Sequence, residues 1–398
     1  MIKKKKFVIG VFTGNRAEYG LQYPIIKAIS EHKKLDYRLI VSGSHLEKNF
    51  GETIEQIKKD KLKISAKIKL KNSSNKNSTY TSLRIAESIF KISKVLRKIK
   101  PDFMLVNADR YETFAAAVAS SQMNIPTCHV EGGDITQGGA LDDSIRHAIT
   151  KLSHLHFATN HQSYKNILKL GEERWRVFNV GLSINDTIYS KKKGSQLYLL
   201  KKYNIDFNKP IIIFTQHSVT TEPEKALKHI SISLKSLQYF IDKKNYQIII
   251  TYPNNDYGYK DIINKIKLFN DKNKQNSQVV KSLGNFDLHS FMSHAQTKEI
   301  IIVGNSSLGI KEAIAFKCPV VNIGKRQAGR LKPPNVVDAK NSYNDINKKI
   351  LKVTNKNFKN KLQNINNPYF KKNTGKKIAN IISKTKLNKK LIQKRITY

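Results

Sequence analysis

The chain has 398 residues, a length that favours two domains of ordinary size over one. Its formal charge of +42 at pH 7 would suit a polyanionic partner, but all but 11 of the 72 basic residues are lysines, and these are spread along the whole chain. Specific readers of nucleic acid rely on arginine and on clustered aromatic residues. We therefore expect no nucleic-acid partner.

The two cysteines, Cys128 and Cys318, lie far apart and neither belongs to a CxxC pair. This spacing indicates neither a disulfide framework nor a zinc ribbon, and it fits a reducing compartment. The basic start of the chain resembles a signal peptide, but the apolar run ends at Gly14 without a cleavage site, so it is interpreted as a buried strand. No stretch approaches the roughly 20 apolar residues that a membrane helix needs. We expect a cytoplasmic protein without membrane contact.

Short apolar runs alternate with longer amphipathic stretches, which is the strand-then-helix order of parallel α/β folds. Lysine-rich segments interrupt this order at 186–209 and predict a linker. The sequence predicts two Rossmann-like, doubly wound domains at 1–185 and 210–365, with a closing helix and basic tail at 366–398. The predicted strands are 7–13, 38–42, 103–107, 127–131, 155–159 and 177–180 in the first domain, and 211–215, 247–251, 278–281, 299–303 and 319–323 in the second.

Ligands of open α/β sheets bind at the carboxyl ends of the strands, so the loop after each strand is a candidate site. The first such loop contains Arg16 and Glu18 and leads into a helix, where backbone N–H groups and an arginine can bind a phosphate. A plain glycine turn with a solvated arginine is an equal alternative. The loop is not a GxGxxG, so a dinucleotide fingerprint is absent.

Acidic residues are scarce, yet six of them fall within 35 residues, at two strand ends and one helix start. Neighbouring carboxylates push one another's pKa values apart and can supply both an acid and a base. Proton transfer is favoured for Asp109 and Glu131, whereas helix capping is an equal alternative for Asp142 and Asp143. The six are Asp109, Glu112, Glu131, Asp134, Asp142 and Asp143, and Arg110 directly follows the first.

Histidines divide into two groups. His154 and His156 alternate on one predicted strand, but no third ligand accompanies them, so a structural role is preferred and no metal is expected. His217 follows the first strand of the second domain, which predicts a place in the substrate site; a partly exposed histidine in a capping loop is the alternative.

The turn at 304–312 follows another strand of the second domain. Its amides and the hydroxyls of Ser306 and Ser307 suit a diphosphate, and Glu312 suits ribose hydroxyls, although a common serine helix cap would look alike. Arg326 and Arg330 follow the next strand. Arginines reach anions in a bidentate manner, and five of the 11 in the chain occupy these candidate loops.

Taken together, these segments resemble the UDP-N-acetylglucosamine 2-epimerase family from about residue 7 to 335. The resemblance is closest to its hydrolysing branch, which supplies sialic-acid-type pathways. The motifs that match in order are TGNRAEYG, ADRYE, HVEGGDITQGGALDDSIRHAITKLSH, TQHSVTTE, TYPNND, GNSSLGIKEA and PVVNIGKRQAGR.

The resemblance implies a glycosyltransferase-B-type fold with the active site in the inter-domain cleft, no metal or other cofactor, and a homodimer or homotetramer. It implies anti elimination of UDP from a UDP-sugar to a 2-acetamidoglycal, followed by hydration with inversion at C2. Carried over by motif, the catalytic residues are Asp109, Glu131, Asp143, Asp142 and His217, and the substrate-binding residues are Arg16, Glu18, Arg110, Asn254, Ser306, Ser307, Glu312 and Arg326.

Two departures from the family pattern bear on the substrate. Ala108 stands where the family usually has glycine, and the acidic loop carries an extra Gln137–Gly139 stretch beside the expected sugar position. UDP-N-acetylglucosamine and a UDP-2,4-diacetamido-2,4,6-trideoxy-glucose are both candidate substrates. A non-hydrolysing UDP-sugar 2-epimerase and a UDP-sugar glycosyltransferase of the same fold are the alternative functions.

Overall fold

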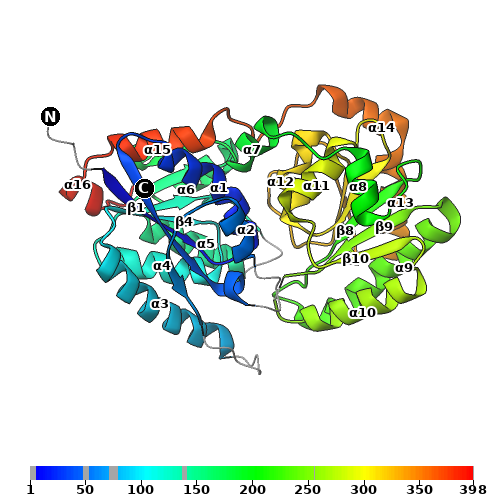
Figure 1. Cartoon of the computed structure of the whole chain (residues 1–398), viewed down its shortest axis with the longest axis horizontal. Helices are drawn as coiled ribbons and strands as arrows, with labels where there is room; N and C mark the ends of the chain where they lie inside the picture. The colour runs from blue at the N-terminus through cyan, green and yellow to red at the C-terminus, as the bar shows by residue number, and fades with distance from the viewer. Residues whose placement is uncertain (1–5, 48–52, 71–78, 137–140, 255, 398) are drawn as a thin grey trace. The chain divides into compact units, whose positions relative to one another are not determined.

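The computed structural model describes residues 6–47, 53–70, 79–136, 141–254 and 256–397, without the side chains of Arg16 and Ala17 (Figure 1). The chain forms two compact units. Unit 1 comprises Met1–Ile135, Asp142–Tyr189 and Tyr369–Tyr398, and unit 2 comprises Thr136–Leu141 and Ser190–Pro368.

In its described part, unit 1 is built on a parallel sheet of seven strands in the order β3-β2-β1-β4-β5-β6-β7. The order reverses at β1, whose neighbours are β2 on one side and β4 on the other. Loops that leave the carboxyl ends of strands on either side of such a reversal diverge and leave room for a ligand. The strands are β1 (Phe7–Thr13), β2 (Leu35–Ser42), β3 (Ile64–Ile68), β4 (Phe103–Asn107), β5 (Thr127–Val130), β6 (Leu155–Ala158) and β7 (Val177–Asn179).

Helices cover both faces of this sheet, as the strand-helix alternation requires (Figure 1). The helices of unit 1 are α1 (Arg16–Ser30), α2 (Ile54–Lys59), α3 (Tyr80–Ile99), α4 (Tyr111–Gln122), α5 (Leu141–Leu152), α6 (His161–Lys169), α7 (Ile184–Ser190), α15 (Thr374–Lys384) and α16 (Lys389–Ile392), with 3₁₀ turns at η1 (Gly43–Leu46) and η3 (Arg174–Arg176).

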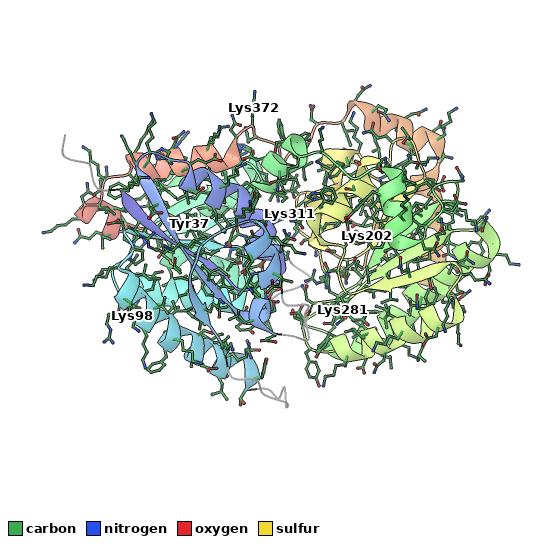
Figure 2. All side chains as sticks on the ribbon, in the orientation of Figure 1. Tyr37, Lys98, Lys202, Lys281, Lys311 and Lys372 are labelled. Carbon is green, nitrogen blue, oxygen red and sulfur yellow. The ribbon has the colours of Figure 1, made fainter. Side chains whose placement is uncertain are left out.

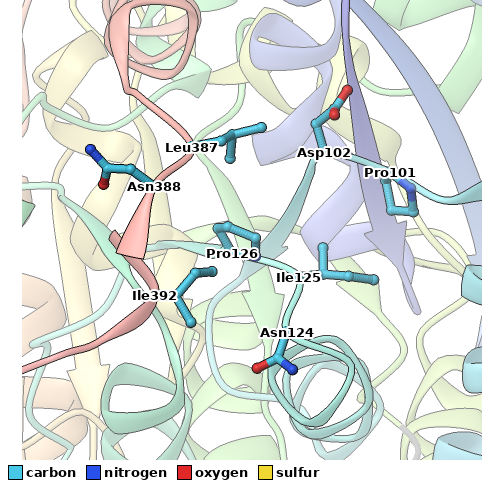
Figure 3. A pocket seen from close by; sticks show the side chains of 8 residues that line it. All are labelled: Pro101, Asp102, Asn124, Ile125, Pro126, Leu387, Asn388 and Ile392. Carbon is cyan, nitrogen blue, oxygen red and sulfur yellow. The ribbon is translucent and has the colours of Figure 1, made fainter. Parts of the chain in front are cut away.

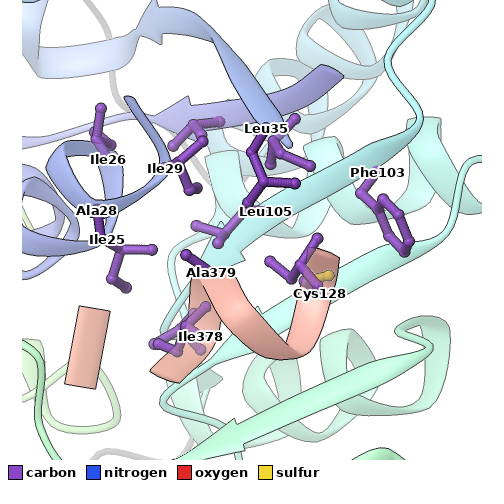
Figure 4. Close-up of a cluster of buried hydrophobic side chains, with 14 of the residues drawn as sticks. Ile25, Ile26, Ala28, Ile29, Leu35, Phe103, Leu105, Cys128, Ile378 and Ala379 are labelled. Carbon is purple, nitrogen blue, oxygen red and sulfur yellow. The ribbon is translucent and has the colours of Figure 1, made fainter. Parts of the chain in front are cut away.

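The C-terminal helix α15 completes the core of unit 1. Figure 4 shows Ile378 and Ala379 of α15 with Ile25 of α1 and Leu105 of β4 in one buried apolar cluster. The helices come so close at Gly375 that an added Cβ would lie 2.5 Å from the carbonyl oxygen of Pro24. Residues from the end of the chain therefore stabilise the sheet that begins it.

In its described part, unit 2 repeats the same design with six parallel strands in the order β10-β9-β8-β11-β12-β13, which reverses at β8. The strands are β8 (Ile211–Thr215), β9 (Gln247–Thr251), β10 (Ser277–Val280), β11 (Ile300–Gly304), β12 (Val320–Ile323) and β13 (Val336–Ala339). The helices are α8 (Gln196–Tyr203), α9 (Ala226–Lys244), α10 (Tyr259–Lys272), α11 (Gly284–Ser293), α12 (Ser307–Lys311), α13 (Tyr343–Thr354) and α14 (Lys356–Lys361), with 3₁₀ turns η4 (Pro223–Lys225), η5 (Ala313–Phe316) and η6 (Leu362–Asn364).

The predicted fold class of two Rossmann-like, doubly wound domains is confirmed. Two edge strands, β3 and β13, were not predicted from the sequence. Both are short and half-exposed, and they carry a lysine or an aspartate where a buried strand would be apolar. Such edge strands lack the continuous apolar run by which buried strands are recognised. The segment predicted as a linker at 186–209 contains the last residues of α7 and the whole of α8.

The positive charge lies over both units rather than in one patch. Lys98 and Lys372 of unit 1 and Lys202 and Lys281 of unit 2 are all exposed (Figure 2). Among the helices that the structure describes, none is long and apolar enough to cross a membrane.

Candidate active site

The loop after β1 is shaped from inside by a buried carboxylate. Asn15 caps α1 by accepting the N–H of Glu18 at 3.0 Å. The Glu18 carboxylate in turn accepts the N–H of Gly14 at 2.7 Å and the hydroxyl of Thr113 at 2.8 Å. Glu18 is only 3% exposed, so its contacts in the structure are with the loop and with α4. The side chain of Arg16, predicted to bind substrate, lies outside the described part.

A second buried carboxylate, Glu112, lies beside Glu18. Burial and the charge of Glu112 raise the pKa of Glu18 to about 8, although its hydrogen bonds and Arg110 act in the opposite direction. Arg110 Nε lies 3.7 Å from Glu112 Oε2. Glu18 is therefore a carboxylic acid near neutral pH, held next to the loop that follows β1.

The centre of the unit 1 site is the buried guanidinium of Arg146, on α5. Its Nη2 donates to Asp109 Oδ2. Its Nη1 donates both to Asp143 Oδ1, at 2.5 Å, and to the backbone carbonyl of Asp134, at 2.9 Å. Asp109 follows β4 and Asp143 lies in the first turn of α5, so Arg146 joins two predicted catalytic carboxylates that are 34 residues apart in the sequence.

Charge explains why Arg146 can be buried. Its side chain is 1% exposed, and burial opposes its charge. The carboxylates of Asp109, Asp134 and Asp143 outweigh this penalty and raise the pKa of Arg146 further above its usual value.

The backbone adopts a left-handed conformation at two positions beside these carboxylates, with φ of +62° at Ala108 and +67° at Glu131. The ring of His129, on β5, contacts the turn after β4 and helix α5. Its Nε2 lies 2.8 Å from the carbonyl oxygen of Ala108, and its Nδ1 lies 3.1 Å from the hydroxyl of Thr150. Burial lowers the pKa of His129 to about 3, so the ring is neutral and its Nε2–H donates to the Ala108 carbonyl. This contact fixes the turn that presents Asp109.

Glu131 is buried and follows β5, the strand that pairs with β4, and its own N–H donates to the carbonyl of Phe157 at 3.1 Å. The neighbouring Asp134 accepts the hydroxyl of Ser163 at 3.1 Å. Asp142 lies next to Asp143 in the first turn of α5. The carboxylates predicted from sequence in the first domain thus come from the ends of β4 and β5 and from the start of α5.

In unit 2, His217 follows β8 and is held in one orientation and one tautomer. The side-chain amide of Asn305, after β11, accepts the His217 N–H at 2.7 Å and donates to the His217 carbonyl at 2.9 Å. The N–H of Asn254, after β9, donates to His217 Nδ1 at 3.0 Å. Because Nδ1 accepts this hydrogen bond, the ring proton of the neutral histidine is on Nε2.

The turn after β11 carries the other predicted nucleotide-binding residues. Gly304 has φ of +135°, and an added Cβ there would lie 1.9 Å from the carbonyl oxygen of Thr215, so only glycine fits where β8 and β11 end. Arg326 and Gln327 both donate to the carbonyl of Asn305, at 3.2 and 2.9 Å. Ser306 and Ser307 begin α12, and both are partly exposed.

Glu312, at the end of α12, has a partner outside the predicted site residues. Its Oε2 lies 2.7 Å from Nε2 of His289, on α11. Arg146 and Asn305 were likewise absent from the predicted site residues. The sequence offers a reason to select Arg146, because arginine is scarce in this chain and concentrates in the candidate loops. Nothing in the local sequence distinguishes Asn305 or His289.

The histidines that could have suggested a metal have structural partners. His156 Nε2 lies 3.0 Å from Glu172 Oε2, and His154 Nδ1 accepts the N–H of Thr127 at 3.1 Å. Within the described ranges, no group of three or more histidine, cysteine, aspartate or glutamate side chains could hold a metal ion.

A pocket lies at the opposite end of the unit 1 sheet (Figure 3). Its lining includes residues that directly precede β4 and β5 and residues near α16. It is therefore remote from the carboxyl ends of these strands, where the acidic cluster lies. The lining residues are Pro101, Asp102, Asn124, Ile125, Pro126, Leu387, Asn388 and Ile392.

Two Rossmann-ordered parallel sheets, one with a cluster of carboxylates at its strand ends, define an α/β enzyme of glycosyltransferase-B type. The family model for UDP-N-acetylglucosamine 2-epimerase matches residues 27–383. The chain belongs to this family, and its relatives support the hydrolysing branch.

Two relatives are named as hydrolysing enzymes. The chain is 35% identical to a GDP/UDP-N,N′-diacetylbacillosamine 2-epimerase (hydrolyzing) of Campylobacter jejuni, over 90% of both chains. It is 31% identical to a UDP-N,N′-diacetylbacillosamine 2-epimerase (hydrolyzing) of Legionella pneumophila, over 87% of both. Among solved structures, the chain shares its fold with the UDP-GlcNAc 2-epimerase of Neisseria meningitidis bound to UDP-GlcNAc. The TM-score is 0.78 at 21% sequence identity, and the match covers 95% of this chain and 100% of that one.

Substituting Ala108 by glycine tests the strain at the turn before Asp109. A left-handed alanine costs about 1–2 kcal/mol, and glycine loses about 0.5–1 kcal/mol more backbone entropy on folding. Ala108→Gly should therefore stabilise unit 1 by up to about 1.5 kcal/mol. Urea unfolding measures the change. As a matched control, Ala117→Gly within α4 should destabilise by about 1 kcal/mol or more. A destabilised Ala108→Gly variant would contradict strain at this position.

The raised pKa of Glu18 makes the stability of unit 1 depend on pH. Between about pH 4.5 and 8 the folded state retains a proton that the unfolded state has released. Stability should therefore fall as pH rises through this window, by up to about 1.4 kcal/mol per pH unit for this one group, and change no further above it. In Glu18→Gln this contribution should vanish, as urea unfolding at several pH values would show. Equal slopes in the two proteins would contradict the buried acid.

Proposed function

We propose that the chain releases UDP and a free 2-epimeric sugar from a UDP-2-acetamido sugar, as a hydrolysing 2-epimerase with Asp109, Glu131 and Asp143 as its proton-transfer groups. The observation that carries this assignment is the buried Arg146, which holds Asp109 and Asp143 together at the end of β4, the strand that pairs with the one Glu131 follows. Carboxylates in unlike surroundings are the usual source of an acid and a base in one site.

The reaction proceeds in two steps. A carboxylate takes the proton from C2, the C1–O bond to UDP breaks with its electron pair leaving on the diphosphate, and a double bond forms between C1 and C2. A proton is then returned to C2 from the opposite face, and the oxygen of water bonds to C1 as that water gives up one proton to a carboxylate. The second step inverts C2 and gives the free sugar.

The proposed role of unit 2 is to bind and stabilise the leaving nucleotide. The Nε2–H of His217, fixed by the contacts of Asn305 and Asn254, is a donor for the diphosphate. A donor that is already oriented stabilises charge as it develops on the leaving group. The other proposed substrate-binding residues are Arg16, Arg110, Asn254, Ser306, Ser307, Glu312 and Arg326, with Glu312 on the ribose hydroxyls.

Two features support a 2,4-diacetamido-2,4,6-trideoxy sugar as the first substrate to examine. The relatives at 35% and 31% identity are both named for diacetylbacillosamine, whereas a relative from Neisseria meningitidis serogroup B named for UDP-N-acetylglucosamine is 30% identical. The Gln137–Gly139 stretch of the acidic loop, which lies outside the described residues, is longer than in N-acetylglucosamine enzymes, as the family resemblance implies. The product would feed nonulosonic acid synthesis.

A cytoplasmic homodimer or homotetramer is proposed for the assembled enzyme. The resemblance to the family supports the assembly, and two buried free cysteines fit a reducing compartment. An active site in a cleft between the two domains likewise stays a prediction.

The proposed reaction is tested by proton NMR of the protein with each UDP-sugar in deuterated water. We expect UDP and a free 2-epimeric sugar with deuterium at C2. A UDP-sugar retained with an epimerised C2 would instead indicate the non-hydrolysing reaction. Turnover only with an added sugar acceptor, and no exchange at C2, would indicate a glycosyltransferase.

Substitution of the three carboxylates tests their roles. Asp109→Asn, Glu131→Gln and Asp143→Asn should each reduce turnover at least about a hundredfold, the low end for a general acid or base, and leave UDP affinity nearly unchanged. Asp142→Asn is the matched neighbour, because Arg146 pairs with Asp143, and it should retain more activity than Asp143→Asn. Wild-type rates in all three variants would refute the assignment.

A further inference from the structure

His289 and Glu312 form a buried pair in unit 2, on two elements that are separate in the sequence. His289 lies on α11 and Glu312 at the end of α12, and His289 Nε2 is 2.7 Å from Glu312 Oε2. The histidine side chain is 3% exposed and that of the glutamate is 12% exposed. An ionised carboxylate only accepts hydrogen bonds, so Nε2–H is the donor.

The surroundings of His289 restrict its ring as well as its hydrogen bond. The ring packs against Phe316 of η5, with ring centroids 5.4 Å apart and an interplanar angle of 37°. The 3₁₀ turn η5 starts directly after Glu312, so the same short segment supplies both the carboxylate and the ring that supports its partner. His289 is therefore a rigid donor that faces Glu312 from the protein interior.

This donor determines which oxygen of Glu312 is free for a ligand. Oε2 is engaged by His289, whereas Oε1 has no hydrogen bond to any residue in the described ranges. A carboxylate with one oxygen fixed has one orientation instead of several. The other oxygen can then accept hydrogen bonds from the hydroxyl groups of a sugar, and binding does not incur the entropy cost of ordering a mobile side chain.

We infer that His289 is a positioning residue for nucleotide recognition: it orients Glu312 so that the carboxylate accepts the ribose hydroxyls of the substrate. This inference rests on the proposed function, which places Glu312 on the ribose. The contribution of His289 is then confined to the ribose hydroxyls and does not extend to the diphosphate or to proton transfer.

A nucleotide without ribose hydroxyls isolates this contribution. Calorimetric titration would compare UDP with 2′,3′-dideoxyuridine 5′-diphosphate on the full-length protein. In His289→Leu we expect UDP to bind at least about tenfold more weakly, because a hydrogen bond to a charged group is lost, and the dideoxy nucleotide to bind as in the wild type. His289→Gln retains an N–H donor and should recover most of the affinity for UDP. In turnover, His289→Leu should raise KM and leave kcat nearly unchanged.

Two further variants control for a general effect on folding. His294→Leu removes a histidine from the C-terminal end of the same helix, whose Nε2 lies 3.1 Å from the carbonyl oxygen of Gly194, and it should leave both nucleotide affinities unchanged. In a Glu312→Gln background, His289→Leu should cause a much smaller loss of UDP affinity than in the wild type.

The outcomes separate this inference from the proposed function. Equal weakening of both nucleotides by His289→Leu, or no weakening of either, would overturn the positioning role. Equal affinity of the wild type for UDP and the dideoxy nucleotide would also overturn it, while C2 exchange and UDP release would still support the epimerase. A wild-type protein that binds neither nucleotide and turns over no UDP-sugar would refute both.

Discussion

The buried charge of Arg146 is the constraint on which the acidic cluster of unit 1 depends. A guanidinium that is almost fully removed from water is stable only where carboxylates offset its desolvation, and here three aspartates do so. The dependence is mutual, because Asp109 and Asp143 would repel each other without the cation between them. Removing one partner from such an arrangement leaves an uncompensated charge, at a cost of about 3–5 kcal/mol. The charges therefore hold the loop after β4 against the start of α5.

The strand order places these groups where chemistry can use them. In both sheets the order reverses at the first strand of the unit, β1 or β8. The loops that bear the candidate residues leave the carboxyl ends of β1, β4 and β5 in one sheet and of β8, β9, β11 and β12 in the other. Backbone geometry refines their positions, through left-handed residues at Ala108 and Glu131 and through Gly304, which no larger residue could replace. Each unit thus combines a rigid sheet with a few loop residues in restricted conformations.

The two units use the same device to orient their polar side chains. A buried residue outside the predicted set holds a predicted one: Arg146 holds Asp109 and Asp143, Asn305 holds His217, and His289 faces Glu312. Arg146 and His289 each contact one side of the carboxyl group that they hold and restrict its rotation, whereas Asn305 holds the backbone of His217. Preorganised groups of this kind stabilise developing charge without rearranging during the reaction.

The sequence by itself determined the fold class, most of the strands and the chemical nature of the candidate residues, because apolar periodicity and the residues that follow each strand are local properties of the chain. It also identified the family, whose model matches residues 27–383. Only the tertiary structure decided which residues support these candidates. Arg146 and Asp109 are 37 positions apart and His217 and Asn305 are 88 apart, and no local pattern links such pairs. The tertiary structure also decided the edge strands β3 and β13 and the packing of α15 on the first sheet. Each of these is stabilised by contacts with distant segments rather than by its own sequence pattern.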